Sequence, residues 1–280
     1  MDASTQTLQN LLTGARFEVL PLRSATAELE QLSPGTTVTV TSSPAKGPEA
    51  TLDLAERAAA MGFHVVPHLA ARLITDTAQL SALLDRMERS GLNEAFVVAG
   101  DSTASPGDFP DALSLLRGME ELGRRPDRVG ITGYPEQHSF IPDSATTQAM
   151  NDKMGYADYI VSQICYDPHT IISWVREVRE RGVLLPIHIG IPGAIDVSKL
   201  LRVSMKMGIG DSMRFLRKQH GVVAKLLSRY TPDHLIDELG PYLLDESLGL
   251  VGWHVYTFNE VGKTVQWRDA LVARMQEVPA

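Results

Sequence analysis

The chain has 280 residues, of which 44% are hydrophobic and 21% charged, so it holds ample material for a large apolar core and is not largely disordered. Its formal net charge of −8 disfavours general binding to nucleic acids or anionic membranes, and its single cysteine excludes an internal disulfide framework and a multi-thiolate metal site. The sequence shows neither a signal-like segment nor an apolar run of about 20 residues, so we expect a cytoplasmic protein without a membrane span.

Eight short segments rich in β-branched residues alternate with longer amphipathic segments. The predicted strands are residues 17–21, 36–41, 63–70, 95–99, 128–133, 159–163, 185–191 and 250–256. Helices are predicted over 52–61, 75–90, 112–122, 168–181 and 196–207, with Asp76 and Asp167-Pro168 as N-terminal caps. Eight such units predict a (β/α)8 TIM barrel rather than an open sheet.

The interval between the seventh and eighth predicted strands is longer than the others. It reads as several helices, over 198–207, 211–219, 222–230 and 232–244. We expect extra helices, at about 208–245, inserted before the last strand. The segment is too short and too helical to enclose a core of its own, so the sequence predicts one catalytic domain over 1–280.

Polar residues gather at the predicted strands of this barrel. They are Glu18 in the first strand, His64 and His68 at the end of the third, Asp101 after the fourth, Tyr134, Glu136 and His138 after the fifth, Gln163 in the sixth, His188 in the seventh, and His254, Tyr256 and Asn259 at the eighth. A single residue of this kind is usually a turn former or a structural hydrogen-bonding group. Because TIM barrels carry their chemistry at the C-terminal ends of the strands, several together predict a pocket there.

Glu18 lies inside an otherwise apolar strand, where a carboxylate is costly to bury. Alternation places Glu18 and Leu20 on one face and Phe17 and Val19 on the other. Burial would raise the pKa of Glu18 and suit it to general acid catalysis near neutral pH. The alternative interpretation is an edge glutamate in contact with water.

No metal site is predicted. His64 and His68 are four residues apart, but Val65, Val66 and Pro67 between them indicate a strand rather than a helix. Nucleotide-loop and nucleophile-elbow motifs are absent from the sequence, and Cys165 sits in an apolar strand end that favours an inert thiol.

A basic cluster stands out in this acidic chain. Its members are Lys199, Arg202, Lys206, Arg214, Arg217 and Lys218, with Asp211 as the single acid among them. Such residues either solvate helix faces or bind an anionic tail or pyrophosphate beside the last crossover.

Six short segments at the strand ends form a recognisable series in chain order. They are 17–21 (FEVLP), 67–69 (PHL), 99–101 (AGD), 134–138 (YPEQH), 163–167 (QICYD) and 255–259 (VYTFN). They resemble the methylenetetrahydrofolate reductase family, whose segments read FEFFPP, PHL, RGD, YPE-x-H, QFFFD and FYTLN. The resemblance runs from the first strand to the eighth and implies a (β/α)8 barrel.

The resemblance also implies an enzyme that reduces 5,10-methylenetetrahydrofolate to 5-methyltetrahydrofolate, with NADH or NADPH as hydride donor. By matching position, Glu18 is the acid that helps to open the imidazolidine ring to an iminium, and Asp101 is a second catalytic residue. Asp101 and Gln163 match residues that hold the pterin, and Tyr256 belongs to the pocket wall. The positions that line the flavin in typical members are here Thr41, His68, Gly100, Tyr134, His138 and Lys153.

This sequence departs from the family at the flavin positions. Ala99 and Asp152 stand where typical members have arginines that face the flavin pyrophosphate, which removes charge-assisted hydrogen bonds and adds repulsion. Residues 208–218 and Val203, where an aromatic residue usually lies beside the folate, depart as well. These departures disfavour FAD, and our hypothesis is a flavin-independent member in which hydride passes directly from NADH to the folate iminium.

Three alternatives stay open. The first is a conventional FAD-dependent reductase, and the second is a folate-dependent methyl-transfer or demethylating enzyme that needs no nicotinamide. The third is a catalytically silent folate-binding barrel, which has no evident need of an acid at Glu18. All of them share a small-molecule folate ligand, and the sequence leaves the oligomeric state open.

Overall fold

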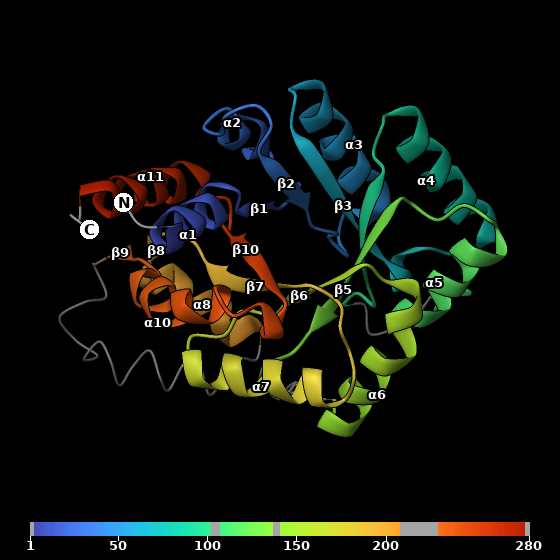
Figure 1. The fold of residues 1–280 in the computed structure, drawn as a ribbon. Helices are drawn as coiled ribbons and strands as arrows, with labels where there is room; N and C mark the ends of the chain where they lie inside the picture. Colours follow the sequence, from blue (N-terminus) through green and yellow to red (C-terminus); the bar gives the residue numbers. More distant parts are fainter. Residues whose placement is uncertain (1–2, 102–106, 137–140, 208–228, 278–280) are drawn as a thin grey trace.

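The computed structural model describes residues 3–101, 107–136, 141–207 and 229–277. Within them, parallel strands close into an eight-stranded barrel, and helices lie around its outside (Figure 1). The hydrogen-bonded order is β1-β10-β7-β6-β5-β4-β3-β2, so the first and last strands of the chain close the barrel. The predicted (β/α)8 fold is confirmed.

All eight predicted strands are found, with small shifts at their ends. They are β1 Arg16–Val19, β2 Thr37–Val40, β3 His64–Ala70, β4 Glu94–Val98, β5 Arg128–Gly133, β6 Tyr159–Ser162, β7 Ile187–Pro192 and β10 Leu250–Tyr256. One placement is wrong, because His64 is exposed at the start of β3 and not at its end. The strand continues through buried residues to Ala70, so only His68 lies toward its C-terminal end.

Helices surround the strands and include the five predicted between them, at 52–61, 75–90, 112–122, 168–181 and 196–207, with shifts at their ends. They are α1 Ala3–Thr13, α2 Ala25–Leu29, α3 Gly47–Ala60, α4 Thr77–Arg89, α5 Ala112–Glu121, α6 Asp143–Lys153, α7 Pro168–Glu180, α8 Val197–Met207, α10 Asp233–Leu243 and α11 Val261–Glu277, with short 3-10 turns at Ala71–Leu73, Met154–Tyr156 and Glu246–Leu248. Both predicted caps form: Asp76 accepts from the Gln79 N–H at 2.7 Å, and Asp167 accepts from the His169 N–H at 3.0 Å. In the part of the chain described, no helix has the length and apolar character needed to cross a membrane.

The segment before the last strand differs in part from its prediction. Helices α8 and α10 are present, whereas the predicted helix 211–219 and most of 222–230 lie outside the described residues. The predicted end of the helix 222–230 is wrong, because Arg229–Tyr230 forms strand β9. This strand pairs antiparallel with β8, Ile195–Asp196. The Tyr230 side chain is buried against Ile195 and Tyr166, so tertiary contacts override the local helical pattern here.

Side chains of alternate residues on the strands enter two different environments. Phe17 and Val19 join the large apolar cluster between the barrel and its helices. Residues of the other parity point into the barrel, where Phe96 and Tyr159 belong to a smaller apolar cluster. The predicted alternation in β1 is therefore confirmed, and it turns Glu18 toward the barrel interior.

Candidate active site

Glu18 lies in β1, next to the strand that closes the barrel. Its backbone is in register with Tyr256 of β10 on one side and Thr39 of β2 on the other. The Glu18 Oε2 atom is 3.2 Å from Nε2 of His254 and 3.8 Å from Nε2 of His68. Only 13% of the Glu18 side chain is exposed, so the edge-glutamate alternative is wrong. The barrel thus brings together one carboxyl group and two imidazoles from three strands.

Burial controls the charge of this group of residues. Burial raises the pKa of Glu18 to about 7, although the nearby His68 acts in the opposite direction. Burial also lowers the pKa of His68 to about 4 and that of His254 to about 3. Both histidines are therefore neutral at pH 7, while Glu18 is divided between its acid and carboxylate forms. A carboxyl group in this state is suited to proton transfer near neutral pH.

The two histidines beside the Glu18 carboxyl group pack against aromatic rings. The His254 ring lies 4.8 Å from the Tyr256 ring and 6.5 Å from the Phe96 ring, measured between centroids. The His68 ring lies 4.8 Å from the same Phe96 ring. Phe96 thus links the two histidines. Nothing in the sequence distinguishes it, because a buried phenylalanine in a strand is ordinary core.

Tyr256, predicted at the pocket wall, is fixed to the neighbouring part of the barrel. Its hydroxyl donates a hydrogen bond to the Ser162 carbonyl oxygen at 3.1 Å. The side chain crosses Gly190, where an added Cβ would lie 2.0 Å from that carbonyl oxygen and 2.8 Å from the Tyr256 ring. Gly190 is therefore required for this close approach. Tyr256 is half-buried beside Glu18.

The predicted folate-binding residues follow β4 and β6. Gly100 has a φ of +88°, which a glycine adopts without strain, and exposed Asp101 comes directly after it. Asp101 acts on Tyr134 through its charge, whereas burial is the main cause that raises the pKa of Tyr134. The Gln163 Oε1 atom accepts a hydrogen bond from the Ile164 N–H at 2.8 Å, so that amide is held against the backbone at the end of β6.

The predicted cofactor positions differ in their surroundings. The Thr41 hydroxyl, after β2, is buried without a hydrogen-bond partner among the described residues. Lys153, at the end of α6, is 7% exposed, and burial lowers its pKa while Asp111 acts in the opposite direction. His138 lies outside the described residues. The structure therefore brings His68 into contact with Glu18, and records no such contact for Lys153.

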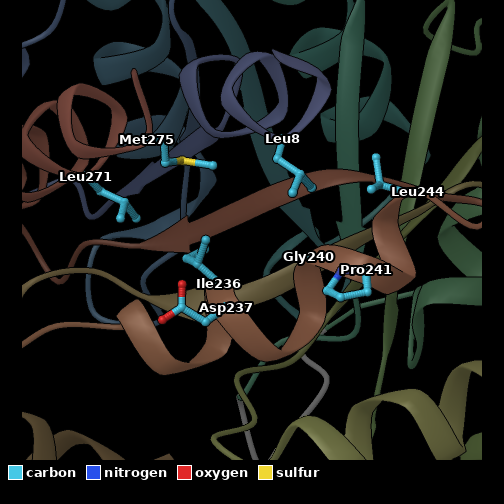
Figure 2. A pocket seen from close by; sticks show the side chains of 8 residues that line it. All are labelled: Leu8, Ile236, Asp237, Gly240, Pro241, Leu244, Leu271 and Met275. Atoms are coloured by element: carbon cyan, nitrogen blue, oxygen red, sulfur yellow. The ribbon is translucent and has the colours of Figure 1, made fainter. Parts of the chain in front are cut away.

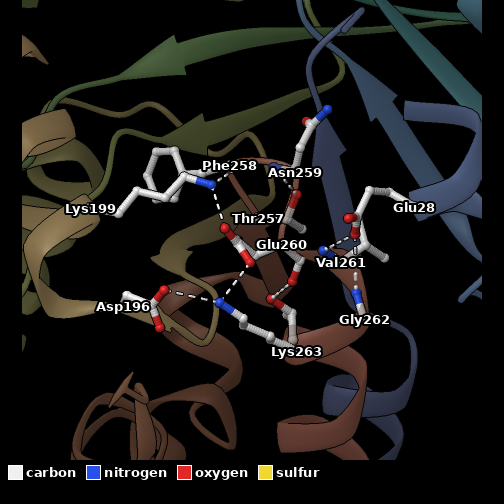
Figure 3. A network of polar contacts seen from close by, with 11 residues as sticks. Glu28, Asp196, Lys199, Thr257, Phe258, Asn259, Glu260, Val261, Gly262 and Lys263 are labelled. Carbon is white, nitrogen blue, oxygen red and sulfur yellow. Dashed lines mark hydrogen bonds and ion pairs between the residues drawn. The ribbon is translucent and has the colours of Figure 1, made fainter. Parts of the chain in front are cut away.

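A polar network joins the C-terminal ends of β1 and β10. Figure 3 shows its continuation from the turn after β10 to Lys199, Asp196 and Glu28. The Asn259 side chain accepts from the Leu20 N–H at 2.7 Å and donates to the Leu20 carbonyl oxygen at 3.1 Å. The Thr257 hydroxyl donates to the Glu18 carbonyl oxygen at 2.5 Å. Phe258 and Asn259 adopt φ values of +52° and +56°, so this turn is held in the left-handed region. These bonds connect the backbone of Glu18 directly to the turn after β10.

One member of the basic cluster belongs to the same network. Lys199 Nζ donates to the Phe258 carbonyl oxygen at 3.1 Å and pairs with Glu260 at 2.5 Å, as Figure 3 shows. Lys263 pairs with Glu260 at 2.9 Å and with Asp196 at 3.1 Å. Lys199 thus fastens α8 to the β10–α11 turn, and the predicted residues Arg214, Arg217 and Lys218 lie outside the described part of the chain.

Other polar groups lie away from the Glu18 site. His188 is near the start of β7, where its ring contacts Tyr159 at 5.5 Å, so it does not join the mouth of the barrel as the sequence suggested. Arg16 and Glu94 form a buried ion pair at 2.5 Å in the same lower layer. Among the described residues, no group of three or more histidines, cysteines or acidic residues is arranged to hold a metal ion.

A cavity of about 350 Å³ lies on the outside of the barrel, between α1, α10 and α11 (Figure 2). It is lined by Leu8, Ile236, Asp237, Gly240, Pro241, Leu244, Leu271 and Met275. These side chains are apolar except for Asp237, and none of them contacts the Glu18 site. The chemistry of the protein is therefore better assigned to the barrel mouth than to this cavity.

Comparisons with known proteins identify the family to which the chain is similar. The family model described as methylenetetrahydrofolate reductase matches residues 18–210, more than half of the chain. Methylenetetrahydrofolate reductase 1 of Schizosaccharomyces pombe is 28% identical over 199 residues, which cover 65% of this chain and 32% of that protein. Methylenetetrahydrofolate reductase (NADH) 1 of Zea mays is 28% identical over 138 residues, covering 41% of this chain and 22% of that protein.

Among solved structures, a chitinase from Pseudoalteromonas aurantia superposes with a TM-score of 0.52 at 13% identity, covering 93% of this chain and all of that one. That likeness shows the barrel fold alone. The chain spans about a third or less of the length of the curated relatives described above. Together with the Glu18 site and the strand-end motifs, the extent of the family match shows that this chain belongs to the methylenetetrahydrofolate reductase family.

Proposed function

We propose that this chain reduces 5,10-methylenetetrahydrofolate to 5-methyltetrahydrofolate, with hydride taken directly from NADH or NADPH and no FAD bound. The observation that carries the proposal is Glu18, a buried carboxyl group at the mouth-facing end of β1 whose pKa is raised to about 7 by burial. Its position within a family that reduces this folate supports the role of an acid. The NADH in the name of the maize relative supports a nicotinamide donor.

Glu18 supplies the proton that opens the five-membered ring of the substrate. The proton moves to a ring nitrogen, the bond between that nitrogen and the methylene carbon breaks, and the carbon is left as an iminium. The nicotinamide nucleotide, when bound, supplies a hydride to that carbon and leaves oxidised. A neutral acid is needed at the start and a carboxylate at the end, which a group with a pKa of about 7 accommodates at little cost in either direction.

Asp101, Gln163 and Tyr256 are proposed to hold the folate. The amino-pyrimidine edge of a pterin offers donors and acceptors that suit a carboxylate and an amide. Tyr256 offers a ring fixed through its bond to Ser162. Thr41, His68, Gly100, Tyr134, His138 and Lys153 are proposed to line the nicotinamide, and the buried unpaired hydroxyl of Thr41 is suited to a polar ligand.

The residues of α6 do not fit a flavin pyrophosphate. Asp152 is exposed on this helix and accepts a hydrogen bond from Gln148 at 2.7 Å, so it presents negative charge. The neighbouring cation, Lys153, is buried and forms no ion pair with a described residue. A pyrophosphate on this helix would meet a carboxylate without a compensating exposed arginine, which supports hydride transfer without FAD.

The deciding experiment is an anaerobic NADH-oxidation assay with methylenetetrahydrofolate, on protein whose absorbance has been checked for flavin. We expect stoichiometric NADH oxidation and methyltetrahydrofolate formation by colourless protein, unchanged by added FAD. Flavin absorbance together with stimulation by FAD would establish the conventional enzyme instead. Folate turnover without NADH oxidation would indicate methyl transfer, and folate binding without turnover would indicate a silent barrel.

A further inference from the structure

His254 is placed so that it can hold the Glu18 carboxyl group in one orientation. It lies in β10, in register with Arg16 of β1 and Gly190 of β7, and is only 1% exposed. Its Nε2 atom is 3.2 Å from Glu18 Oε2, the sole hydrogen-bonding contact that a described side chain makes with this carboxyl group. His68 approaches the same oxygen, but at 3.8 Å it is beyond hydrogen-bonding distance.

The hydrogen-bonding state of His254 follows from its surroundings. Burial, helped by the positive charge of Arg16, lowers its pKa to about 3, so the ring carries one proton at neutral pH. Its Nδ1 atom is buried and has no hydrogen-bond partner among the described residues. A buried N–H without an acceptor is rare and costly, so the proton belongs on Nε2, which faces the carboxyl oxygen. His254 is therefore a donor to Glu18.

We propose that His254 is the positioning residue of the proposed acid: its Nε2–H bond to Oε2 fixes the Glu18 carboxyl group, so that Oε1 carries the proton delivered to the folate. This inference rests on the proposed function. Oε1 accepts no hydrogen bond from a described residue, which leaves it available to the substrate. When the O–H bond of Oε1 breaks, negative charge develops on the carboxylate, and the bond from His254 strengthens because its acceptor becomes ionised. His254 thus favours the transition state over the ground state.

The groups that face Glu18 come from several strands, and the test must separate His254 from them. They are His68 of β3, Tyr256 of β10 and, through its charge on His254, Arg16 of β1. All of them are retained in single variants at position 254. His254→Leu removes the donor, whereas His254→Gln keeps an amide N–H that can reach the same oxygen.

His188→Leu is the matched control. His188 is a half-buried histidine inside the barrel, and desolvation lowers its pKa as well. Its ring contacts Tyr159 rather than Glu18, so the same change of residue type inside the same barrel leaves the Glu18 contact intact. A general effect of placing leucine inside the barrel will appear in this variant too.

The first measurement follows the carboxyl stretch of Glu18 by infrared difference spectroscopy, on substrate-free protein against Glu18→Gln, as a function of pH. We expect the wild-type band to titrate near pH 7. In His254→Leu the midpoint moves up by about one pH unit, because the bond that favours the carboxylate is lost. His254→Gln restores the midpoint, and His188→Leu leaves it unchanged.

The second measurement is the rate of folate reduction over the same pH range, with folate affinity measured separately. We expect His254→Leu to lower kcat by about 10- to 100-fold with little change in Kd, and His254→Gln to recover most of the loss. An unshifted infrared midpoint in His254→Leu, or an equal loss of kcat in His254→Leu and His188→Leu, would overturn the role of His254. Suppose that the wild type shows the infrared titration and that His254→Leu shifts its midpoint, but the wild type reduces no folate. That result would overturn the proposed function alone, because the infrared measurement needs no substrate.

Discussion

Burial of Glu18 raises the pKa of its carboxyl group and lowers the stability of the folded protein at alkaline pH. The folded-state pKa of Glu18 is about 7 against an ordinary value of 4.5, so folding favours the protonated form. The stability that this group contributes is complete below pH 4.5 and is lost as the pH rises toward 7. Above pH 7 the ionised carboxylate in the barrel lowers the free energy of unfolding by about 3 kcal/mol.

Glu18→Gln should therefore be more stable than wild type at alkaline pH. At pH 8 we expect its free energy of unfolding to exceed that of wild type by up to about 3 kcal/mol, with the difference disappearing near pH 4.5. Urea denaturation at the two pH values measures this. Because both proteins keep His68 and His254, the titration of these histidines largely cancels in the comparison. Equal stability of the two proteins at pH 8 would mean that Glu18 is not buried as a charge.

The same ionisation predicts how activity depends on pH. An acid must be protonated, so kcat of folate reduction should fall as the pH rises through about 7. Glu18→Gln should bind folate but lose at least about 100-fold in kcat across the range. A wild-type rate that stays constant to pH 9 would remove Glu18 from the role of acid.

At the scale of elements, the turn between β10 and α11 holds the end of β1 in place. Asn259 bonds to both the N–H and the carbonyl oxygen of Leu20, two residues after Glu18. Glu28 of α2 accepts from the Val261 N–H at 2.8 Å, at the first turn of α11, as Figure 3 also shows. Because the turn has left-handed backbone at Asn259, asparagine is among the few residues that fit there at low cost.

Asn259→Ala should lower the free energy of unfolding by about 2 to 3 kcal/mol, because it removes two part-buried hydrogen bonds and places alanine in the left-handed region. Asn259→Asp keeps the acceptor for the Leu20 N–H and tolerates the same backbone, so we expect a smaller loss, of about 1 kcal/mol. Urea denaturation followed by circular dichroism measures both. If the two variants were equally stable, the clamp on Leu20 would not contribute.

Local sequence predicted the elements well and the inserted segment less well. The β-branched runs and the caps Asp76 and Asp167 act over a few residues, so they could be recognised without the fold. The strand Arg229–Tyr230 could not, since it exists only through pairing with Ile195–Asp196. Helix α11 lacks a strong apolar stripe of its own and packs on α1 from the other end of the chain.

At the scale of the whole molecule, a buried ion pair crosses the lower part of the barrel. Arg16 of β1 and Glu94 of β4 are 78 residues apart in the chain and pair at 2.5 Å, with side-chain exposures of 6% and 8%. The Arg16 guanidinium also lies over the Tyr159 ring at 4.5 Å from its centroid. The layer below the Glu18 site therefore contains a buried ion pair, whose arginine also packs on an aromatic ring.

Breaking this pair should be costly, while replacing both partners should cost less. We expect Arg16→Met to lower the free energy of unfolding by about 3 to 5 kcal/mol, because Glu94 is left buried with Arg128, at 3.7 Å, as its remaining cationic partner among the described residues. The double variant Arg16→Met with Glu94→Leu should lose clearly less than the two single losses combined. Urea denaturation of the four proteins tests this, and additive losses would contradict a coupled pair.

The barrel, the order of its strands along the chain and the unusual carboxyl group at Glu18 followed from the amino-acid pattern, because periodicity and an acidic residue in an apolar strand are local properties. The partners of that carboxyl group did not. His254 is 236 residues away in the chain and meets Glu18 only because β10 closes the barrel against β1. The bonds from Tyr256 to Ser162 and from Lys199 to Glu260 likewise depend on long-range strand and helix placement. The closure of the barrel is not encoded by any short segment of the sequence. It places the neutral side chain of His254 within hydrogen-bonding distance of the buried Glu18 carboxyl group.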